Sequence, residues 1–194
     1  MPNAEMVLSN SLATLKDVNA SAHDRAVSLC WTLHLLGDLH QPLHTANLVT
    51  HKRPKGEGLG GSHIALDSRG KQIDFHSFWD QLPGVEPSYQ SVAALADKLM
   101  SDPKLKPTSM KEYRENKTIA SWVQESFRLA VNFAYDEDRV KFVHEDDLKS
   151  GKISPSAVPK LKADFVEEAR TIAHRRLVLA GQRLTDELKR ATKQ

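Results

Sequence analysis

A run of apolar residues from Ala26 to Leu39 ends just before Pro42, and it constrains the fold more than any other part of the chain. The run reads AVSLCWTLHLLGDL and is long enough for several helical turns. It predicts a helix that is buried on most of its faces, with Cys30 as a free thiol in the core. Proline lacks the N–H that would continue the helix, so Pro42 predicts a kink or an end there.

The spacing of apolar residues elsewhere also favours helices. We expect helices over residues 4–16, 88–100, 118–135 and 159–190, the last long enough to accommodate a break or bend near Ala180 and Gly181. Ser21 or Asn19 is the candidate N-cap before the apolar run. HIAL and QIDFH, joined by a turn with a glycine, predict a β-hairpin, and HSFWDQL predicts the start of another helix. The remaining polar stretches predict loops: 45–62, 101–113 and 136–156.

The expected fold class is therefore all-α, with one multi-helix domain over residues 1–194 and one small hairpin. A net charge of +2 is too small to demonstrate a polyanionic partner. A single cysteine excludes an intrachain disulfide. The sequence has no apolar run of about 18 residues, the length that would predict a membrane-spanning helix. The opening MPNAEMVLSN lacks the basic and apolar regions of a signal peptide.

Imidazole and carboxylate side chains gather in two short segments, HLLGDLHQPLH and DFHSFWD. His34 and Asp38 are four residues apart and so share a helix face, and His76 and Asp80 repeat this spacing. His44 follows the turn at Pro42. Neutral imidazoles and carboxylates suit zinc, and a catalytic zinc usually has three protein ligands plus water. We therefore expect His44, His76 and Asp80 to complete one open site, and His34 and Asp38 to form part of another.

Each of these pairs also has a structural interpretation. A single histidine beside a carboxylate on a helix is more often a surface ion pair or a hydrogen-bonded core group than a metal ligand. Asp38 fits that interpretation poorly, because an unpaired carboxylate in so apolar a helix would be costly. Two His-x-x-x-Asp pairs and His44 within one short region together favour a metal centre.

The segments HLLGDLHQPLH, Gly60-Gly61 and DFHSFWD, followed by SWVQES and AGQRL, resemble the zinc-dependent single-strand nuclease and 3'-nucleotidase family of the mung bean nuclease type. This family shares its fold and zinc core with bacterial zinc phospholipase C. The resemblance covers essentially the whole chain. It implies a phospholipase C/nuclease-like helical bundle.

The resemblance also implies a ligand set. His34 and Asp38 correspond to ligands of one zinc, with Asp38 also bridging to a third metal and taking part in water activation, whereas His44, His76 and Asp80 hold the second zinc. The family holds three zinc ions. Its other ligands lie upstream of the matched region, so the resemblance implies a chain without the family's N-terminal third, with one complete zinc site and part of a second. His23, Asp24 and His51 are weak candidates to replace the missing ligands.

The implied reaction is hydrolysis of single-stranded DNA or RNA to 5'-phosphates, with 3'-nucleotidase activity, by metal-activated water. Gly61 and Ser62 correspond to a weak substrate-binding segment, in which the family usually has Asn where this chain has Ser62. The family further implies a secreted or periplasmic protein that is a monomer. Two alternatives remain: a zinc phospholipase C and a non-enzymatic zinc-binding helical domain.

Several other residues are expected to have supporting positions. His40 is expected to make a hydrogen bond behind the ligands or to be partly exposed, and Gly37 to allow close packing beside the metals. Trp79 is expected in the core. The resemblance implies helix packing and ion pairing for three residues of the later helices, Trp122, Glu125 and Arg183. Lys52, Arg53 and Lys55 are expected in a solvated loop that could also attract phosphate.

Overall fold

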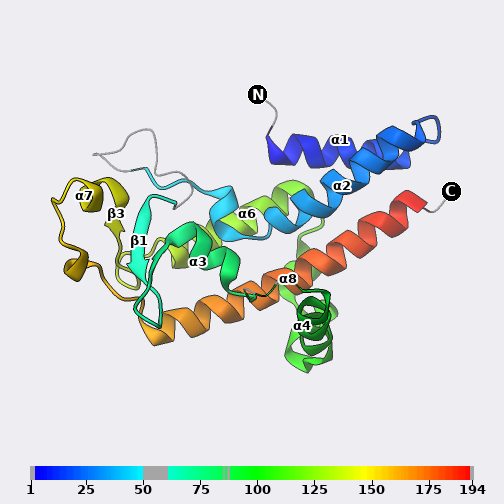
Figure 1. The fold of residues 1–194 in the computed structure, drawn as a ribbon. Coiled ribbons are helices and arrows are strands. Elements are labelled where there is room, and N and C mark those ends of the chain that lie inside the picture. The colour runs from blue at the N-terminus through cyan, green and yellow to red at the C-terminus, as the bar shows by residue number, and fades with distance from the viewer. Residues whose placement is uncertain (1–2, 50–60, 85, 87, 193–194) are drawn as a thin grey trace.

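The computed structural model of the chain describes residues 3–49, 61–84, 86 and 88–192. Within them, the structure has eight α-helices and a small three-stranded sheet at one end of the molecule, which confirms the all-α class (Figure 1). The helices are α1 Ala4–Lys16, α2 Ala22–Asp38, α3 Phe75–Gln81, α4 Tyr89–Ser101, α5 Lys111–Glu115, α6 Ile119–Leu129, α7 Glu145–Lys149 and α8 Ala163–Thr192. The strands are β1 His63–Leu66, β2 Gln72–Asp74 and β3 Val143–His144. No helix in these described ranges is long and apolar enough to cross a membrane.

Helix α8 runs through most of the molecule and links two apolar cores (Figure 1). Its N-terminal half packs with the sheet and α3 around Phe75, Trp79 and Phe165. Its C-terminal half packs with α1, α2 and α6 around Leu36 and Trp122. The helix is continuous through Ala180 and Gly181, so no break interrupts it there. The ligand-bearing end of α2 and helix α3 are therefore both placed against the same long helix.

Helix α2 is exposed on one side, so the prediction of burial on most faces was wrong. The Ser21 hydroxyl caps it by accepting from the Asp24 N–H at 3.1 Å, and it begins four residues earlier than expected. Its buried residues follow a single helical stripe: Ser28, Thr32, Leu35 and Leu36. The side chains between them lie on the other side, and Val27, Cys30, Trp31 and Leu33 are exposed in the described structure. The apolar residues of a helix do not by themselves show how many neighbouring elements cover it.

The expected hairpin forms between β1 and β2, with Ile64 opposite Asp74 and Leu66 opposite Gln72. Gly70 has φ +81° in the connecting turn, a conformation that side-chain-bearing residues rarely adopt. Strand β3, which was not expected, pairs with the other edge of β1. The prediction of a loop over 136–156 was wrong in part, because this stretch contains β3 and α7. The prediction of a loop over 101–113 was also wrong in part, because this stretch contains two short 3-10 turns and the start of α5.

Two helix ends differ from the expected bounds for local reasons. Helix α6 changes at Ala130 to a π-helical turn that lasts to Ala134, within the expected range. Helix α8 begins four residues late, because Leu66 of β1 accepts from the Leu161 N–H at 2.9 Å and donates to the Pro159 carbonyl at 2.8 Å. These pairings keep residues 159–161 extended beside the sheet.

Candidate metal centre

The C-terminus of α2 and a 3-10 turn, η1 (Pro42–Thr45), carry three of the five predicted ligands. Helix α2 ends at Asp38, as Pro42 predicts, and the chain turns so that His44 lies back towards Asp38. Pro42 and Leu43 are buried, which anchors η1 in the core. The Gln41 side chain accepts from the Leu43 N–H at the start of the turn.

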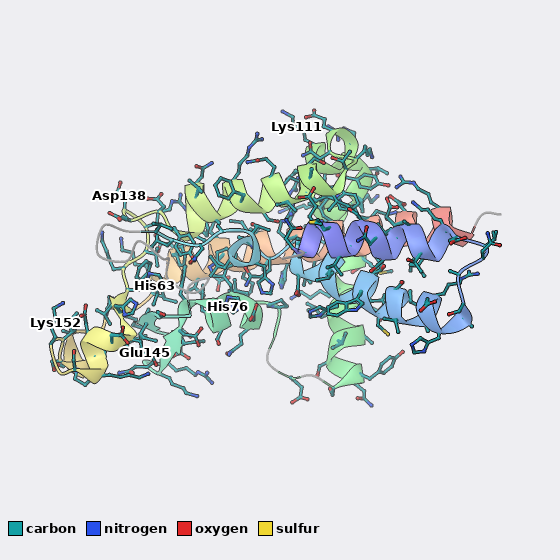
Figure 2. All side chains as sticks on the ribbon, turned by 90° about the horizontal axis from the view of Figure 1, so that it is seen from above. His63, His76, Lys111, Asp138, Glu145 and Lys152 are labelled. Carbon is teal, nitrogen blue, oxygen red and sulfur yellow. The ribbon has the colours of Figure 1, made fainter. Side chains whose placement is uncertain are left out.

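Helix α3 carries the other two ligands, His76 and Asp80 (Figure 2 labels His76). The Asp74 carboxylate accepts from the Ser77 N–H at 2.8 Å and caps the helix. Phe75, at 0% exposure, and Trp79, at 1%, fix one face of α3 in the core, which confirms the expected position of Trp79. The i to i+4 spacing then places His76 and Asp80 together on the other face.

His44, His76 and Asp80 meet between η1 and α3. His44 Nε2 lies 3.5 Å from Asp80 Oδ1, and His76 Nε2 lies 3.4 Å from Asp80 Oδ2. The two imidazole rings stack with their centroids 4.9 Å apart. One potential ligand atom from each residue lies within 4.8 Å of the others. Among the described residues, this is the group of three or more such side chains that could hold a metal ion.

The donor set fits zinc on its chemistry. Two neutral imidazoles and one carboxylate match the ligand types of catalytic zinc sites, which leave a fourth position for water. His44 Nε2 is buried and has no partner at normal hydrogen-bond geometry; the carboxylate oxygen that it faces, Asp80 Oδ1, lies 3.5 Å away. A buried imidazole nitrogen that faces a carboxylate and a second imidazole without a normal hydrogen bond fits a metal ligand whose metal is not bound.

The charges at the centre influence each other. Asp80 is the main cause that raises the pKa of the His44 imidazole, against the effect of burial, and Asp38 raises it further. The interaction with His44 is in turn the main cause that lowers the pKa of Asp80, and the Gln41 amide adds to it. In the metal-free protein, these neighbours therefore favour a protonated His44 beside an ionised Asp80.

His34 and Asp38 form a pair without a third metal-binding partner among the described residues. His34 Nε2 lies 3.1 Å from Asp38 Oδ2, and the His34 side chain is 64% exposed. The same Asp38 oxygen lies 3.5 Å from His44 Nδ1. The His44 ring thus lies between two carboxylates, with Asp38 at one nitrogen and Asp80 at the other. The five residues are adjacent, but only three of them form a closed ligand group.

The other expected site residues lie beside this centre or outside the described chain. Gly61 is exposed and Ser62 half-buried just before β1, where the Ser62 carbonyl accepts from the Glu145 N–H at 2.8 Å. No measured contact relates them to the metal ligands, so their role in substrate binding stays a prediction. Lys52, Arg53, Lys55 and His51 lie outside the described residues. Gly37 does not fit the expected close packing, since an added Cβ would have nothing within 4 Å.

A buried hydrogen-bond network joins the residues after α2 to helices α6 and α8. His40 is 2% exposed; its Nδ1 donates to the Leu36 carbonyl at 2.7 Å, and its Nε2 accepts from Arg183 at 2.8 Å. Burial is the main cause that lowers the pKa of His40, followed by the charges of Arg176 and Arg183. His40 is therefore neutral and fully hydrogen-bonded, which fits the expected role behind the ligands.

Arg176 connects this network to the turn. Its Nε donates to the His40 carbonyl at 3.1 Å, and its Nη2 donates to the Ser126 hydroxyl at 2.7 Å. Ser126 donates to the Leu39 carbonyl at 2.5 Å. Arg176 was not assigned a role from the sequence. Its only signal was an arginine on the apolar stripe of α8.

Glu125 is the acidic member of the network. Its carboxylate accepts from Arg176 and, at 2.7 Å and 2.8 Å, from Arg183. Burial opposes its charge, but these hydrogen bonds and the arginine charges outweigh burial and lower its pKa. Arg183 also stacks on Trp122, with its guanidinium carbon 5.1 Å from the ring centroid. The expected packing and ion pairing of these three residues is thus observed.

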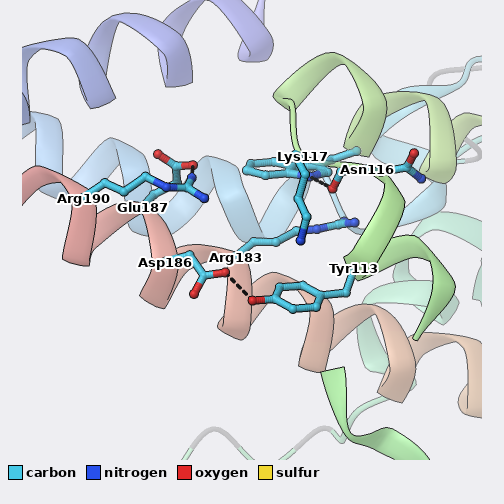
Figure 3. Close-up of a pocket in the computed structure, with 8 residues that line it drawn as sticks. Tyr113, Asn116, Lys117, Arg183, Asp186, Glu187 and Arg190 are labelled. Carbon is cyan, nitrogen blue, oxygen red and sulfur yellow. Dashed lines mark hydrogen bonds and ion pairs between the residues drawn. The ribbon is translucent and has the colours of Figure 1, made fainter. Parts of the chain in front are cut away.

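The outer side of the network borders a shallow pocket lined by polar side chains, with about 220 Å³ of empty space when the solvent at its mouth is included. Figure 3 shows Arg183 at this pocket beside Tyr113, whose hydroxyl donates to Asp186 at 2.8 Å. Lys117 lies over the Tyr113 ring, 4.1 Å from its centroid. The basic groups here already have acidic or aromatic neighbours, so we assign the pocket to the support of α8.

A larger cleft opens beside the metal group. It has a volume of about 510 Å³, including solvent at its mouth, and shares Gln41 and Asp80 with the centre. Its walls are mainly apolar and come from α2, η1, α3 with the residues after it, and α8: Gly37, Pro42, Trp79, Pro83, Ala173 and Leu177. The cleft gives a bound molecule access to the side of Asp80.

Comparison with known protein families gives one match. The sequence model of the S1/P1 nuclease family matches residues 4–193. No curated protein matches the chain. The match extends over α1 to α8 and includes all five predicted metal ligands.

Proposed function

The chain belongs to the S1/P1 nuclease family, and we propose that it is a zinc-dependent phosphodiesterase that cleaves single-stranded DNA or RNA to 5'-phosphates and also removes 3'-phosphates from nucleotides. Membership by itself supports a nuclease in general, and the family is generally zinc-dependent. The observation that carries the finer proposal is the group of His44, His76 and Asp80, in which a buried imidazole nitrogen has no hydrogen-bond partner. Single strands suit such a site because an unpaired base can leave its stack and enter a pocket.

In this proposal, His44, His76 and Asp80 hold one zinc ion, and His34 and Asp38 contribute to a neighbouring one. Zinc in such a site lowers the pKa of a water molecule and neutralises charge on a phosphate. The further proposal is that Asp38 accepts a proton from the attacking water and holds His44; in its support, Asp38 Oδ2 lies 3.5 Å from His44 Nδ1. The cleft beside Asp80 can receive part of the nucleotide. Gly61 and Ser62 are proposed to contact substrate, and the protein is proposed to act as a secreted or periplasmic monomer.

The test is hydrolysis by the purified chain with zinc added, on single-stranded DNA, the matching duplex and 3'-AMP. Cleavage of the single strand in preference to the duplex, release of phosphate from 3'-AMP, and loss of both with a chelator are expected. Hydrolysis of phosphatidylcholine vesicles without DNA cleavage would favour a phospholipase C instead. Binding of one zinc without any hydrolysis would favour a zinc-binding domain that is not an enzyme.

Zinc affinity is expected to fall as the pH is lowered from about 8 to about 6. Zinc needs the neutral form of His44, and Asp80 and Asp38 raise the pKa of that imidazole above its ordinary value. The proton therefore begins to compete with zinc at a higher pH than at an ordinary histidine. Calorimetric titration in buffers of different ionisation enthalpy measures the proton released. Zinc binding that is constant over this range and releases no proton would contradict the assignment of His44 as a ligand.

A further inference from the structure

We propose that Gln41 is a positioning residue for the metal centre, which holds Asp80 so that the carboxylate binds zinc through one oxygen only. The inference rests on the proposed zinc site but concerns a side chain outside the ligand group. Gln41 lies between α2 and η1. It contacts η1, which carries His44, and α3, which carries His76 and Asp80.

The Gln41 side-chain amide makes two hydrogen bonds, one as acceptor and one as donor. Its Oε1 accepts from the Leu43 N–H, one residue before His44. Its Nε2 donates to Asp80 Oδ1 at 3.0 Å. Asp80 lies 39 residues further along the chain, so one side chain joins the turn that carries His44 to the helix that carries His76 and Asp80.

The direction of the amide follows from its partners. A backbone N–H can only donate, so the atom that faces Leu43 must be the amide oxygen. The NH2 group must then face Asp80, where it meets an acceptor. Leu43 has 0% exposure, which fixes the turn and with it the donor that faces the carboxylate.

A donor at Oδ1 limits how the carboxylate can bind zinc. Carboxylates bind metals through one oxygen or through both. The Gln41 hydrogen bond uses a lone pair of Oδ1 and leaves Oδ2, which lies 3.4 Å from His76 Nε2, as the better ligand atom. Two imidazoles and one carboxylate oxygen leave the fourth position of a tetrahedral site open. Gln41 thus preserves the open position that hydrolysis needs.

Two substitutions separate the roles of Gln41. Gln41→Asn keeps an oxygen that can accept from the N–H two residues on, as in an Asx turn, but it is one methylene too short to reach Asp80. Gln41→Ala removes both hydrogen bonds. The matched control is Gln182→Ala, which removes a Gln-to-Asp hydrogen bond of the same 3.0 Å length, to Asp186 within α8.

Three measurements are made on each full-length variant: zinc affinity by competition with a chromophoric chelator, the thermal midpoint of the metal-free protein, and the visible spectrum of the cobalt-substituted protein. For Gln41→Asn we expect an unchanged metal-free midpoint and about 10- to 100-fold weaker zinc binding, the usual effect of losing a partner of a ligand. Its cobalt bands should be weaker, because binding through both carboxylate oxygens raises the coordination number. Gln41→Ala should show these changes and a lower midpoint, and Gln182→Ala none at the metal.

The outcomes distinguish this inference from the proposed function. If the wild type binds zinc and Gln41→Asn matches it in affinity and in cobalt spectrum, the role of Gln41 is wrong and the zinc site stands. If the affinity falls while the cobalt spectrum is unchanged, the control of carboxylate binding is wrong. If the wild type binds neither metal, both proposals fail.

Discussion

Replacing Asp80 with alanine is expected to weaken zinc binding by more than about 100-fold, because loss of a ligand should exceed the effect of losing one of its hydrogen-bond partners. Asp80 contacts both His44 and His76. It is the negatively charged member of the group, so it also offsets the positive charge of the zinc ion. At a fixed zinc concentration far above the dissociation constants of both proteins, a 100-fold loss of affinity removes about 2.7 kcal/mol from the free energy of unfolding.

The measurements for Asp80→Ala are zinc content after dialysis and thermal midpoints with and without zinc. The metal-free midpoint should change little, because the Asp80 side chain is 46% exposed. Asp97→Ala, at an exposed position on α4, is the matched control and should bind zinc like the wild type. Wild-type zinc binding by Asp80→Ala would rule out the assignment of the site.

Replacing Glu125 with alanine is expected to destabilise the fold by about 3–5 kcal/mol, the usual result of breaking a buried ion pair. Glu125 is 9% exposed, and it is the acceptor shared by Arg176 and Arg183, which are 4% and 2% exposed. Without it, two buried guanidinium groups face each other with no carboxylate between them. The loss should occur without any metal, since Glu125 is not a ligand.

Urea unfolding in the presence of a chelator measures this effect separately from zinc. The matched control is Glu168→Ala, which removes an acceptor of Arg139 at 2.7 Å on the exposed surface, where ion pairs contribute little. It should leave the unfolding midpoint almost unchanged. Equal effects of the two substitutions would show that the buried network does not stabilise the fold as described.

The sequence predicted those parts of the fold and site that depend on local spacing. Helix α1 has the expected bounds, Pro42 ends α2, and the four-residue spacing places His76 beside Asp80. These features follow from the geometry of a helical turn and from the missing N–H of proline, so neighbours in space were not needed.

Features that depend on distant partners were not predictable in the same way. Strand β3 has two residues and exists only because β1 offers a free edge. Arg176 reaches Glu125, 51 residues away, and Gln41 reaches Asp80, 39 residues away. Trp31 is exposed because no helix in the described part of the chain covers its side of α2, whereas its apolar character alone predicted burial. Spacing along the chain contains no information about these pairings.

The position of His44 before the hairpin and of His76 after it has a consequence for folding. A metal held by both closes a loop of about thirty residues, in the manner of a covalent cross-link. On a chain-entropy basis, closing a loop of this length restricts the unfolded chain by roughly 3–4 kcal/mol. A zinc ion bound there would therefore tie the hairpin and α3 to the end of α2, and would restrict the chain as well as supply the chemistry of the reaction.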